Sequence, residues 1–63
     1  MDLKQYYEKQ VIIISEGEMF VGTINDYFES DDNEDGLESI VMDTTDGDII
    51  EFNEERINKI III

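Results

Sequence analysis

Residues 10–24 read QVIIISEGEMFVGTI, two apolar runs joined by Glu16-Gly17. Gln10–Ser15 is apolar at successive positions, which is typical of a strand with apolar residues on both faces. Glu16-Gly17 favours a tight turn. A second, longer strand is therefore predicted over Glu18–Phe28.

The second predicted strand has a glycine in its interior. Phe20 and Ile24 share one face of this strand, and Gly22 lies between them on the same face. A glycine inside a strand often marks a sharp bend or the close approach of another backbone. We therefore expect this strand to be shared between two halves of a small barrel.

Three more strands are predicted downstream, over Glu38–Thr44, Asp48–Phe52 and Ile57–Ile63. The connections include a polar loop, Glu29–Gly36, and a turn, Thr45-Asp46-Gly47. Before the last strand, Asn53 can cap a single helical turn that carries two acidic residues at its start.

The residues ahead of the first strand favour a short helical segment. Asp2–Lys9 allows one or two turns, with Asp2 as the capping residue. Leu3, Tyr6 and Tyr7 would share one face. Because so short a helix is not stable alone, we expect it to pack on another part of the molecule.

These elements predict an all-β fold, in which residues 1–63 form one domain. The architecture is a five-stranded small barrel with a short N-terminal helical turn and a one-turn helix before the last strand. A one-residue error in strand phase would exchange the two faces of a strand. The expected core residues are Val11, Ile13, Phe20, Ile24, Ile40, Met42, Ile50, Phe52, Ile57 and Ile61.

This arrangement resembles the Src-homology-3-like small barrels and, within them, the Sm-like fold. Gly17–Ile24, GEMFVGTI, looks like the first Sm signature, with a turn glycine, apolar residues and a second glycine. The whole chain also resembles short acidic Sm-like proteins of Gram-positive bacteria and their mobile elements. Those proteins mostly have no assigned function, so the resemblance implies a fold and no activity. The residues that carry this second likeness are Gly22, Asp26-Tyr27, Asp32-Asn33 and Glu38-Ser39-Ile40.

The sequence departs from the Sm-family RNA binders at both parts of their RNA site. Phe28 occupies the position of the family's loop aspartate, and residues 54–57 read EERI where the family has an arginine–glycine pair. The resemblance therefore implies the fold without the RNA site.

Charge sets the strongest limits on function. The 63 residues include 17 acidic and 4 basic side chains, for a formal net charge of −13. Contact with phosphate backbones relies on Lys and Arg, so we expect neither direct nucleic-acid binding nor association with an anionic membrane. A basic protein surface is the partner that electrostatics favours.

The chain contains no cysteine and no histidine. Disulfides and thiolate or imidazole metal sites are therefore excluded, and a catalytic Cys–His pair is absent. The carboxylates lie in predicted exposed turns, where pKa shifts useful for acid–base catalysis are not expected. We expect no enzyme activity and no cofactor. The absence of cysteine, of a signal peptide and of a membrane-spanning stretch predicts a cytoplasmic protein.

Residues 26–38 form the candidate binding region, in which 7 of 13 residues are acidic and none is basic. Two interpretations stay open. The region docks a basic protein surface, with mimicry of nucleic acid as the sharper form, or it is a solvated loop that keeps the protein soluble. The candidate partner-binding residues are Asp26, Tyr27, Glu29, Asp31, Asp32, Glu34, Asp35 and Glu38.

The same region contains half of a calcium-loop pattern. Asp31, Asn33 and Asp35 supply oxygens at alternate positions and are followed by Gly36. The twelfth position, which should be a bidentate glutamate, is Met42. The pattern therefore makes these three residues only a weak calcium candidate.

Ile60–Ile63 is apolar at every position. Alternate residues of a strand face opposite sides, so one pair would face the core and the other pair a neighbouring element. If the neighbour is a second copy, this segment is an oligomer edge made by Ile60, Ile61, Ile62 and Ile63. The alternative function is then a self-assembling Sm-like structural homo-oligomer without RNA binding.

Four aromatic residues, Tyr6, Tyr7, Tyr27 and Phe28, allow two interpretations. They could line a peptide-binding groove, as in small barrels that bind proline-rich segments. A core this small needs its large side chains, so plugging of the barrel ends is favoured.

Overall fold

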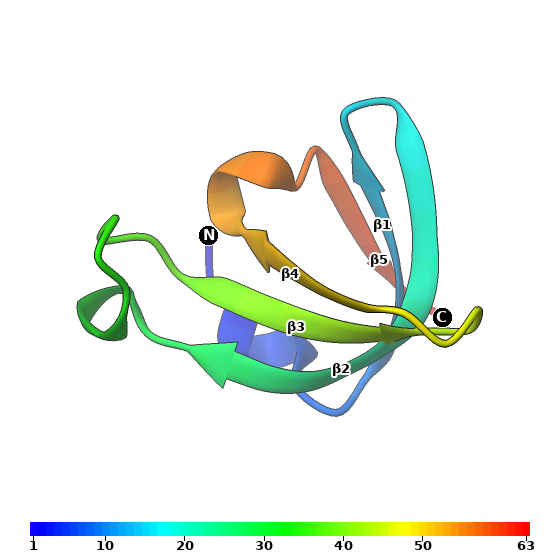
Figure 1. Ribbon diagram of the computed structural model, residues 1–63, viewed down its shortest axis with the longest axis horizontal. Coiled ribbons are helices and arrows are strands. Elements are labelled where there is room, and N and C mark those ends of the chain that lie inside the picture. The colour runs from blue at the N-terminus through cyan, green and yellow to red at the C-terminus, as the bar shows by residue number, and fades with distance from the viewer.

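The computed structural model describes all 63 residues and contains one antiparallel sheet of five strands with three short 3-10 turns. The order across the sheet is β4-β3-β2-β1-β5, so β2 lies at its centre (Figure 1). No helical segment is long and apolar enough to cross a membrane. The strands are β1 (Gln10–Ser15), β2 (Glu18–Phe28), β3 (Ser39–Thr44), β4 (Ile49–Asn53) and β5 (Lys59–Ile62), and the turns are η1 (Leu3–Tyr6), η2 (Ser30–Asp32) and η3 (Glu54–Arg56).

The predicted all-β fold is confirmed, and the β1–β2 hairpin has the expected tight turn. Glu16 and Gly17 have φ angles of 53° and 82°. Two central residues with positive φ define a type I′ turn, whose twist matches that of the flanking strands. The turn fixes the register in which Ser15 pairs with Glu18.

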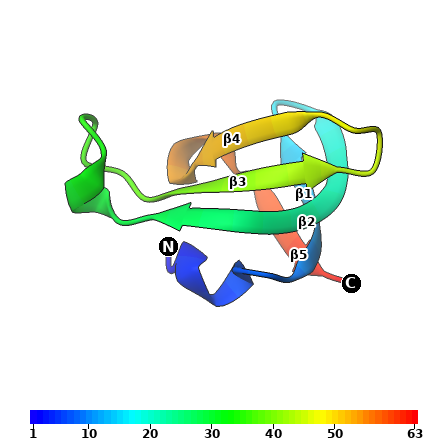
Figure 2. The same cartoon turned by 60° about the horizontal axis from the view of Figure 1, so that its bottom comes forward.

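Gly22 lies where β2 pairs with strands of both halves of the sheet. Its position pairs with Val11 of β1 on one side and with Thr44 of β3 on the other. A Cβ atom at Gly22 would overlap the carbonyl oxygen of Asp43. The expected close backbone approach is therefore confirmed, and β1 and β5 run steeply across the direction of β3 and β4 (Figure 2).

The sheet is open, so the predicted closed barrel is not confirmed. β4 pairs only with β3 and β5 only with β1, and no ladder joins β4 to β5. The turn η3 lies between them, and the Asn53 side chain caps it by accepting a hydrogen bond from the backbone N–H of Arg56 at 3.0 Å, as expected. The last strand begins at Lys59 instead of Ile57, because the Ile57 N–H donates to the Glu54 carbonyl and ends η3, while the Ile57 side chain joins the core.

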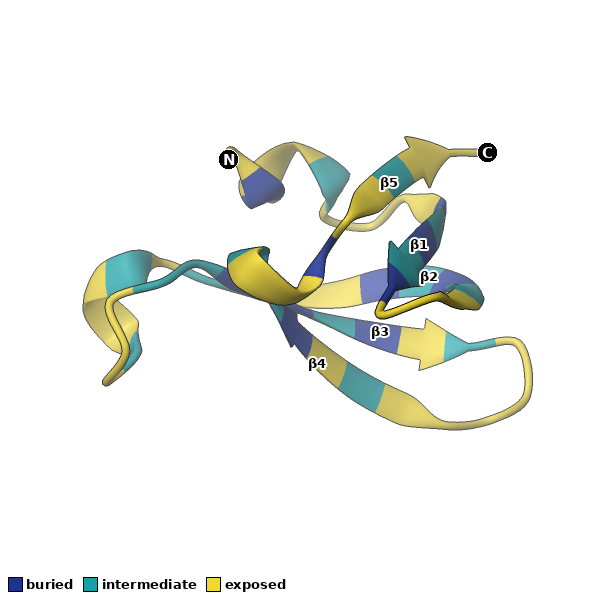
Figure 3. Ribbon diagram, turned by 90° about the horizontal axis from the view of Figure 1, so that it is seen from above, coloured by how far each residue is buried: buried dark blue, intermediate teal, exposed yellow.

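Eight apolar side chains form the core. Figure 3 marks the buried positions along the ribbon in dark blue. Phe20 and Phe52 meet edge to face, with ring centroids 5.3 Å apart. Phe20 and Ile50, both expected in the core, are half-buried and pack against it. The buried residues are Leu3, Val11, Ile13, Ile24, Ile40, Met42, Phe52 and Ile57.

The expected core position of Ile61 is wrong. Ile60 pairs with the buried Ile13 and packs on the core, whereas Ile61 pairs with Ile12 and is 43% exposed. Four consecutive isoleucines give no alternation from which the inward pair could be chosen.

The N-terminal segment packs on another part of the molecule as predicted, namely β2 and β3, but as a 3-10 turn. The Asp2 side chain makes no capping hydrogen bond, contrary to expectation. Leu3 is fully buried and Tyr6 packs against the core, while Tyr7 is 45% exposed. Of the four aromatics expected to close the barrel ends, Tyr6 and Tyr27 contact the core.

Candidate functional site

The acidic loop, residues 29–38, connects β2 to β3 and projects from one end of the molecule (Figure 1, green). Its first half is the turn η2, in which the N–H of Asp32 donates to the Glu29 carbonyl at 3.0 Å. The N–H of Gly36 donates to the Asn33 carbonyl at 3.1 Å, and Gly36 has a positive φ of 72°. The loop is therefore held by its own backbone.

Asn33 closes the acidic loop against the sheet. Its side-chain amide donates to the Leu37 carbonyl at 2.6 Å and to the Ser39 hydroxyl at 3.2 Å. Ser39, which is buried, in turn donates to a Glu51 carboxylate oxygen at 2.8 Å. This chain of hydrogen bonds ties the loop to β3 and β4.

A polar groove of about 490 Å³ lies between the acidic loop, β3, β4 and η3. Its single cation, Arg56, lies over the Phe52 ring at 5.6 Å and donates to the Glu51 carbonyl at 3.3 Å. The only salt bridge in the molecule joins the Met1 amino group to Glu54, so Arg56 has no ion-pair partner. No apolar side chain lines the groove, whose residues are Asn33, Glu34, Asp35, Ser39, Glu51, Asn53 and Arg56.

Tyr27 and Glu38 face each other beside the N-terminal turn. The Tyr27 hydroxyl donates to Glu38 at 2.7 Å, and the Leu3 backbone N–H donates to the other carboxylate oxygen at 3.0 Å. The hydrogen bond to Glu38 raises the pKa of Tyr27 to about 12. Hydrogen bonds from the Leu3 N–H, which has the larger effect, and from the Tyr27 hydroxyl hold the pKa of Glu38 below its usual value of 4.5. Glu38 is thus charged and fixes Leu3 over the core.

The structure separates the eight candidate residues into three groups. Tyr27 and Glu38 are half-buried and hold the N-terminal turn. Two others are exposed but bind local backbone: Asp26 accepts from the Tyr27 N–H, and Asp35 accepts from the Leu37 N–H. The remaining four are exposed and make no side-chain hydrogen bond or ion pair; they are Glu29, Asp31, Asp32 and Glu34.

The weak calcium candidate is not assembled. The Asn33 amide is committed to Leu37 and Ser39, and Asp35 is bonded to the Leu37 N–H. No three acidic side chains come together closely enough to hold a metal ion.

The segment predicted as an oligomer edge forms one border of the sheet. β5 pairs only with β1, so its outer backbone edge is free, and β4 leaves a second free edge at the opposite border. Ile60 faces the core, whereas Ile61, Ile62 and Ile63 are 43%, 48% and 68% exposed.

Sequence reasoning missed the part of the groove that lies outside residues 26–38. Ser39 pairs with Asn53 and Val41 with Glu51 across β3 and β4, and η3 then adds Arg56. Only the strand register brings these residues to the loop, and the register is not readable from residue type alone.

The fold and these surfaces define a small, acidic, all-β protein. No protein-family model, no curated protein and no solved structure matches the chain.

Proposed function

We propose that this protein is a non-enzymatic interaction module that binds a basic protein surface through its acidic loop. The observation that carries the proposal is that Glu29, Asp31, Asp32 and Glu34 are exposed and unpaired, while other residues hold the loop in shape. The charges therefore need no reorganisation before they meet Lys or Arg side chains.

Charge of this kind acts mainly on the encounter. A surface of one sign steers an oppositely charged partner and raises the association rate, and salt screens the effect. The groove beside the loop, which Glu34 and Asp35 also line, adds the carboxylate of Glu51. Mimicry of a nucleic-acid backbone is the sharper form of the proposal, because a nucleic-acid-binding protein already presents matching cations.

The test is affinity capture at low salt, identification of the protein that a salt gradient releases, and titration of that purified partner by calorimetry. The loop variant is D31K/D32K/E34K, which spares the structural Asp35. The matched control is D2K/E8K/E55K, three exposed sites elsewhere with the same change in net charge. The loop variant should lose about 100-fold or more in affinity, since several close charge pairs are reversed, and the control less than about fivefold. Equal losses would show that net charge alone matters and would overturn the assignment to the loop.

A second candidate function is a structural homo-oligomer built on an Sm-like barrel. Two free sheet edges favour it, because β5 of one copy can add to β4 of the next. Ile62→Lys should then lower the sedimenting mass to that of a monomer, while the loop variant should leave the mass unchanged. A wild-type chain that sediments as a monomer at every concentration would remove this candidate.

A further inference from the structure

β1, β2 and β5 carry an apolar surface on the side of the sheet away from the core. Strand alternation turns Val11 and Ile13 inward, so Ile12 and Ile14 point outward. The register places Ile12 between Ile61 and Val21, and Ile14 between Lys59 and Met19. Ile63 follows Ile61 on the same side. We call this surface the apolar face; it consists of Ile12, Ile14, Met19, Val21, Ile61 and Ile63.

Half of the apolar face is exposed, whereas Ile12, Ile14 and Val21 are half-buried. Met19, Ile61 and Ile63 are 65%, 43% and 68% exposed. Among the cross-strand partners on this side of β1, β2 and β5, the only charged side chain is Lys59, and the polar residues are Gln10 and Thr23. In a chain with 17 acidic residues, a carboxylate-free apolar surface of this kind is a typical protein-contact site.

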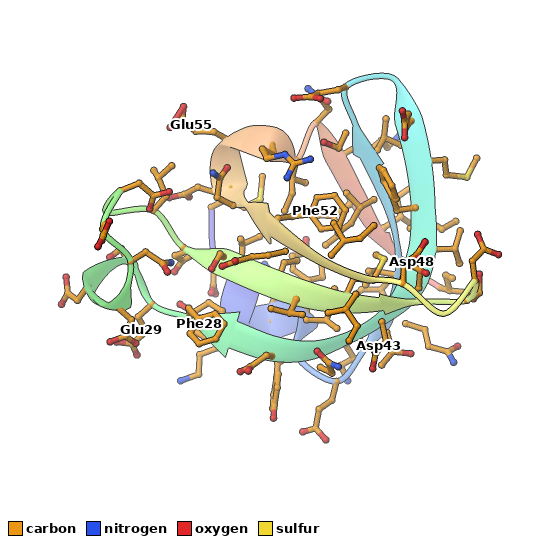
Figure 4. All side chains as sticks on the ribbon, in the orientation of Figure 1. Phe28, Glu29, Asp43, Asp48, Phe52 and Glu55 are labelled. Atoms are coloured by element: carbon orange, nitrogen blue, oxygen red, sulfur yellow. The ribbon has the colours of Figure 1, made fainter.

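Carboxylates border the apolar face on the side of β3 and β4. Thr23 pairs with Asp43, and the β3–β4 turn carries Asp46 and Asp48. Figure 4 shows Asp43 and Asp48 at one end of the molecule and Glu29, the first residue of the acidic loop, at the other. The apolar face therefore has a negatively charged rim of its own, separate from the acidic loop.

Two hollows lie where the apolar face meets this rim. One, of about 210 Å³, is lined by Met19 and Val21 of the face, by the carboxylates of Asp46 and Asp48, and by Phe20 and Ile50, which also pack against the core. The other, of about 320 Å³, is lined by Val21, Ile63 and Asp43 among others. Each hollow offers an apolar wall and a carboxylate, which suits the aliphatic stem and cationic head of a Lys or Arg side chain.

We propose that the apolar face is a second contact surface, which binds a partner segment with apolar side chains flanked by Lys or Arg. The apolar side chains cover Ile12 and Ile61, and the cations enter the two hollows and reach Asp43, Asp46 or Asp48. The inference rests on the proposed function in one respect, namely that the partner is basic.

Charge complementarity selects such a partner over a second copy of this chain. Two copies joined face to face would bring two acidic rims together, and each copy carries a net charge of −13. An anionic membrane is disfavoured for the same reason. A segment with an apolar centre and cationic flanks matches both the face and its rim.

The test uses the whole ¹⁵N-labelled protein and two defined peptides. One is a short helical peptide of Leu and Lys with a single Trp, in which Leu and Trp share one face. The other has the same composition in scrambled order. The expected result is that the first peptide shifts amide resonances of β1, β2 and β5, and that its Trp emission moves to shorter wavelength as in an apolar site. The protein has no Trp of its own to interfere.

Two neighbouring residues give a matched pair of variants. Ile61 and Ile62 are similarly exposed, at 43% and 48%, but lie on opposite faces of β5. Ile61→Ser should weaken binding of the first peptide about fivefold, because the peptide no longer buries the exposed half, roughly, of an isoleucine side chain. Ile62→Ser should weaken it less than about twofold. Met19→Ser, on β2, should repeat the effect of Ile61→Ser away from the sheet edge.

Four results would overturn the inference. They are equal binding of the scrambled peptide, resonance shifts confined to residues 29–38, no saturable binding of either peptide, and self-association of the free protein that Met19→Ser abolishes. The loop variant D31K/D32K/E34K separates this inference from the proposed function. The first peptide should still shift the β1, β2 and β5 resonances of this variant, even though the variant no longer captures a natural partner.

Discussion

Salt should stabilise this protein strongly, because its own charges repel one another. The Cα radius of gyration is 10.6 Å, which corresponds to a uniform sphere of about 14 Å radius. An unfolded chain of this length has a radius of gyration of about 24 Å, so unfolding spreads the −13 charge over a much larger volume. Repulsion therefore opposes folding, and screening relieves it.

The size of the effect follows from Coulomb's law with screening. In a medium of dielectric constant about 80, the difference in self-repulsion between the folded and unfolded states is about 12 kcal/mol with a Debye length of about 30 Å at 0.01 M salt. It falls to about 7 kcal/mol with a Debye length of about 8 Å at 0.15 M salt. The gain of about 5 kcal/mol is an upper bound, because real unfolded chains are more compact and already feel part of the repulsion.

The assay is thermal unfolding followed by circular dichroism in 0.01 M and 0.15 M NaCl. Each kcal/mol shifts Tm by about 4–8 °C in a domain of this size, so the upper bound corresponds to a rise of about 20–40 °C. We expect a rise of about 10 °C, which requires only about 2 kcal/mol of the bound. Repulsion scales with the square of net charge. The D31N/D32N/E34Q variant, with a net charge of −10 instead of −13, should show about 0.6 of the wild-type salt effect. The D2N/E8Q/E55Q variant should show the same fraction. A salt-independent Tm, or an unchanged salt effect in both variants, would refute the reasoning.

Three further predictions concern the fold. Leu3→Ala removes a fully buried side chain, so it should cost about 2–5 kcal/mol in urea unfolding; a cost below about 1 kcal/mol would mean that the N-terminal turn is dispensable. Gly22→Ala should prevent native β2–β3 pairing because its methyl group overlaps the Asp43 carbonyl, and an unchanged amide spectrum would contradict this. The Tyr27–Glu38 pair should stabilise the fold above about pH 4.5, where the unfolded carboxyl is charged, and lose effect as pH falls through the lowered pKa of Glu38. At the alkaline end, stability should fall between pH 10 and about 12, since the pKa of Tyr27 is raised, and Tyr27→Phe should abolish that alkaline loss.

The positions of the strands and turns could be predicted from the sequence, because the residue patterns that mark them are local. Glu16-Gly17 predicts the tight turn, Gly22 predicts a sharp bend or a close backbone approach, and Asn53 predicts the capped turn before the last strand. All five strands begin within two residues of their predicted starts. Closure into a barrel was not readable, because it depends on whether β4 reaches β5 after η3, and no residue pattern encodes that distance.

The candidate site was predictable only as a region. Composition alone marks residues 26–38 as acidic, but it does not distinguish the structural Glu38 from the unpaired Asp31. That difference arises from the N-terminal turn, which delivers the Leu3 N–H to Glu38 across 35 positions of the chain. The apolar face could not be predicted either, because four consecutive isoleucines do not show which residues of β5 face the core and which face outward.

The two proposed contact surfaces use different physical terms and should respond to salt differently. Contacts at the acidic loop are mainly electrostatic and weaken as salt rises, whereas burial of the apolar face persists in salt. A net charge of −13 exceeds the magnitude of about 2–8 that keeps a small domain soluble, and the excess repulsion destabilises the free protein. A basic partner that binds only the folded state relieves this repulsion as well as forming contacts, so binding and folding are thermodynamically linked. The same carboxylates that weaken the isolated fold therefore favour its complex with a basic surface.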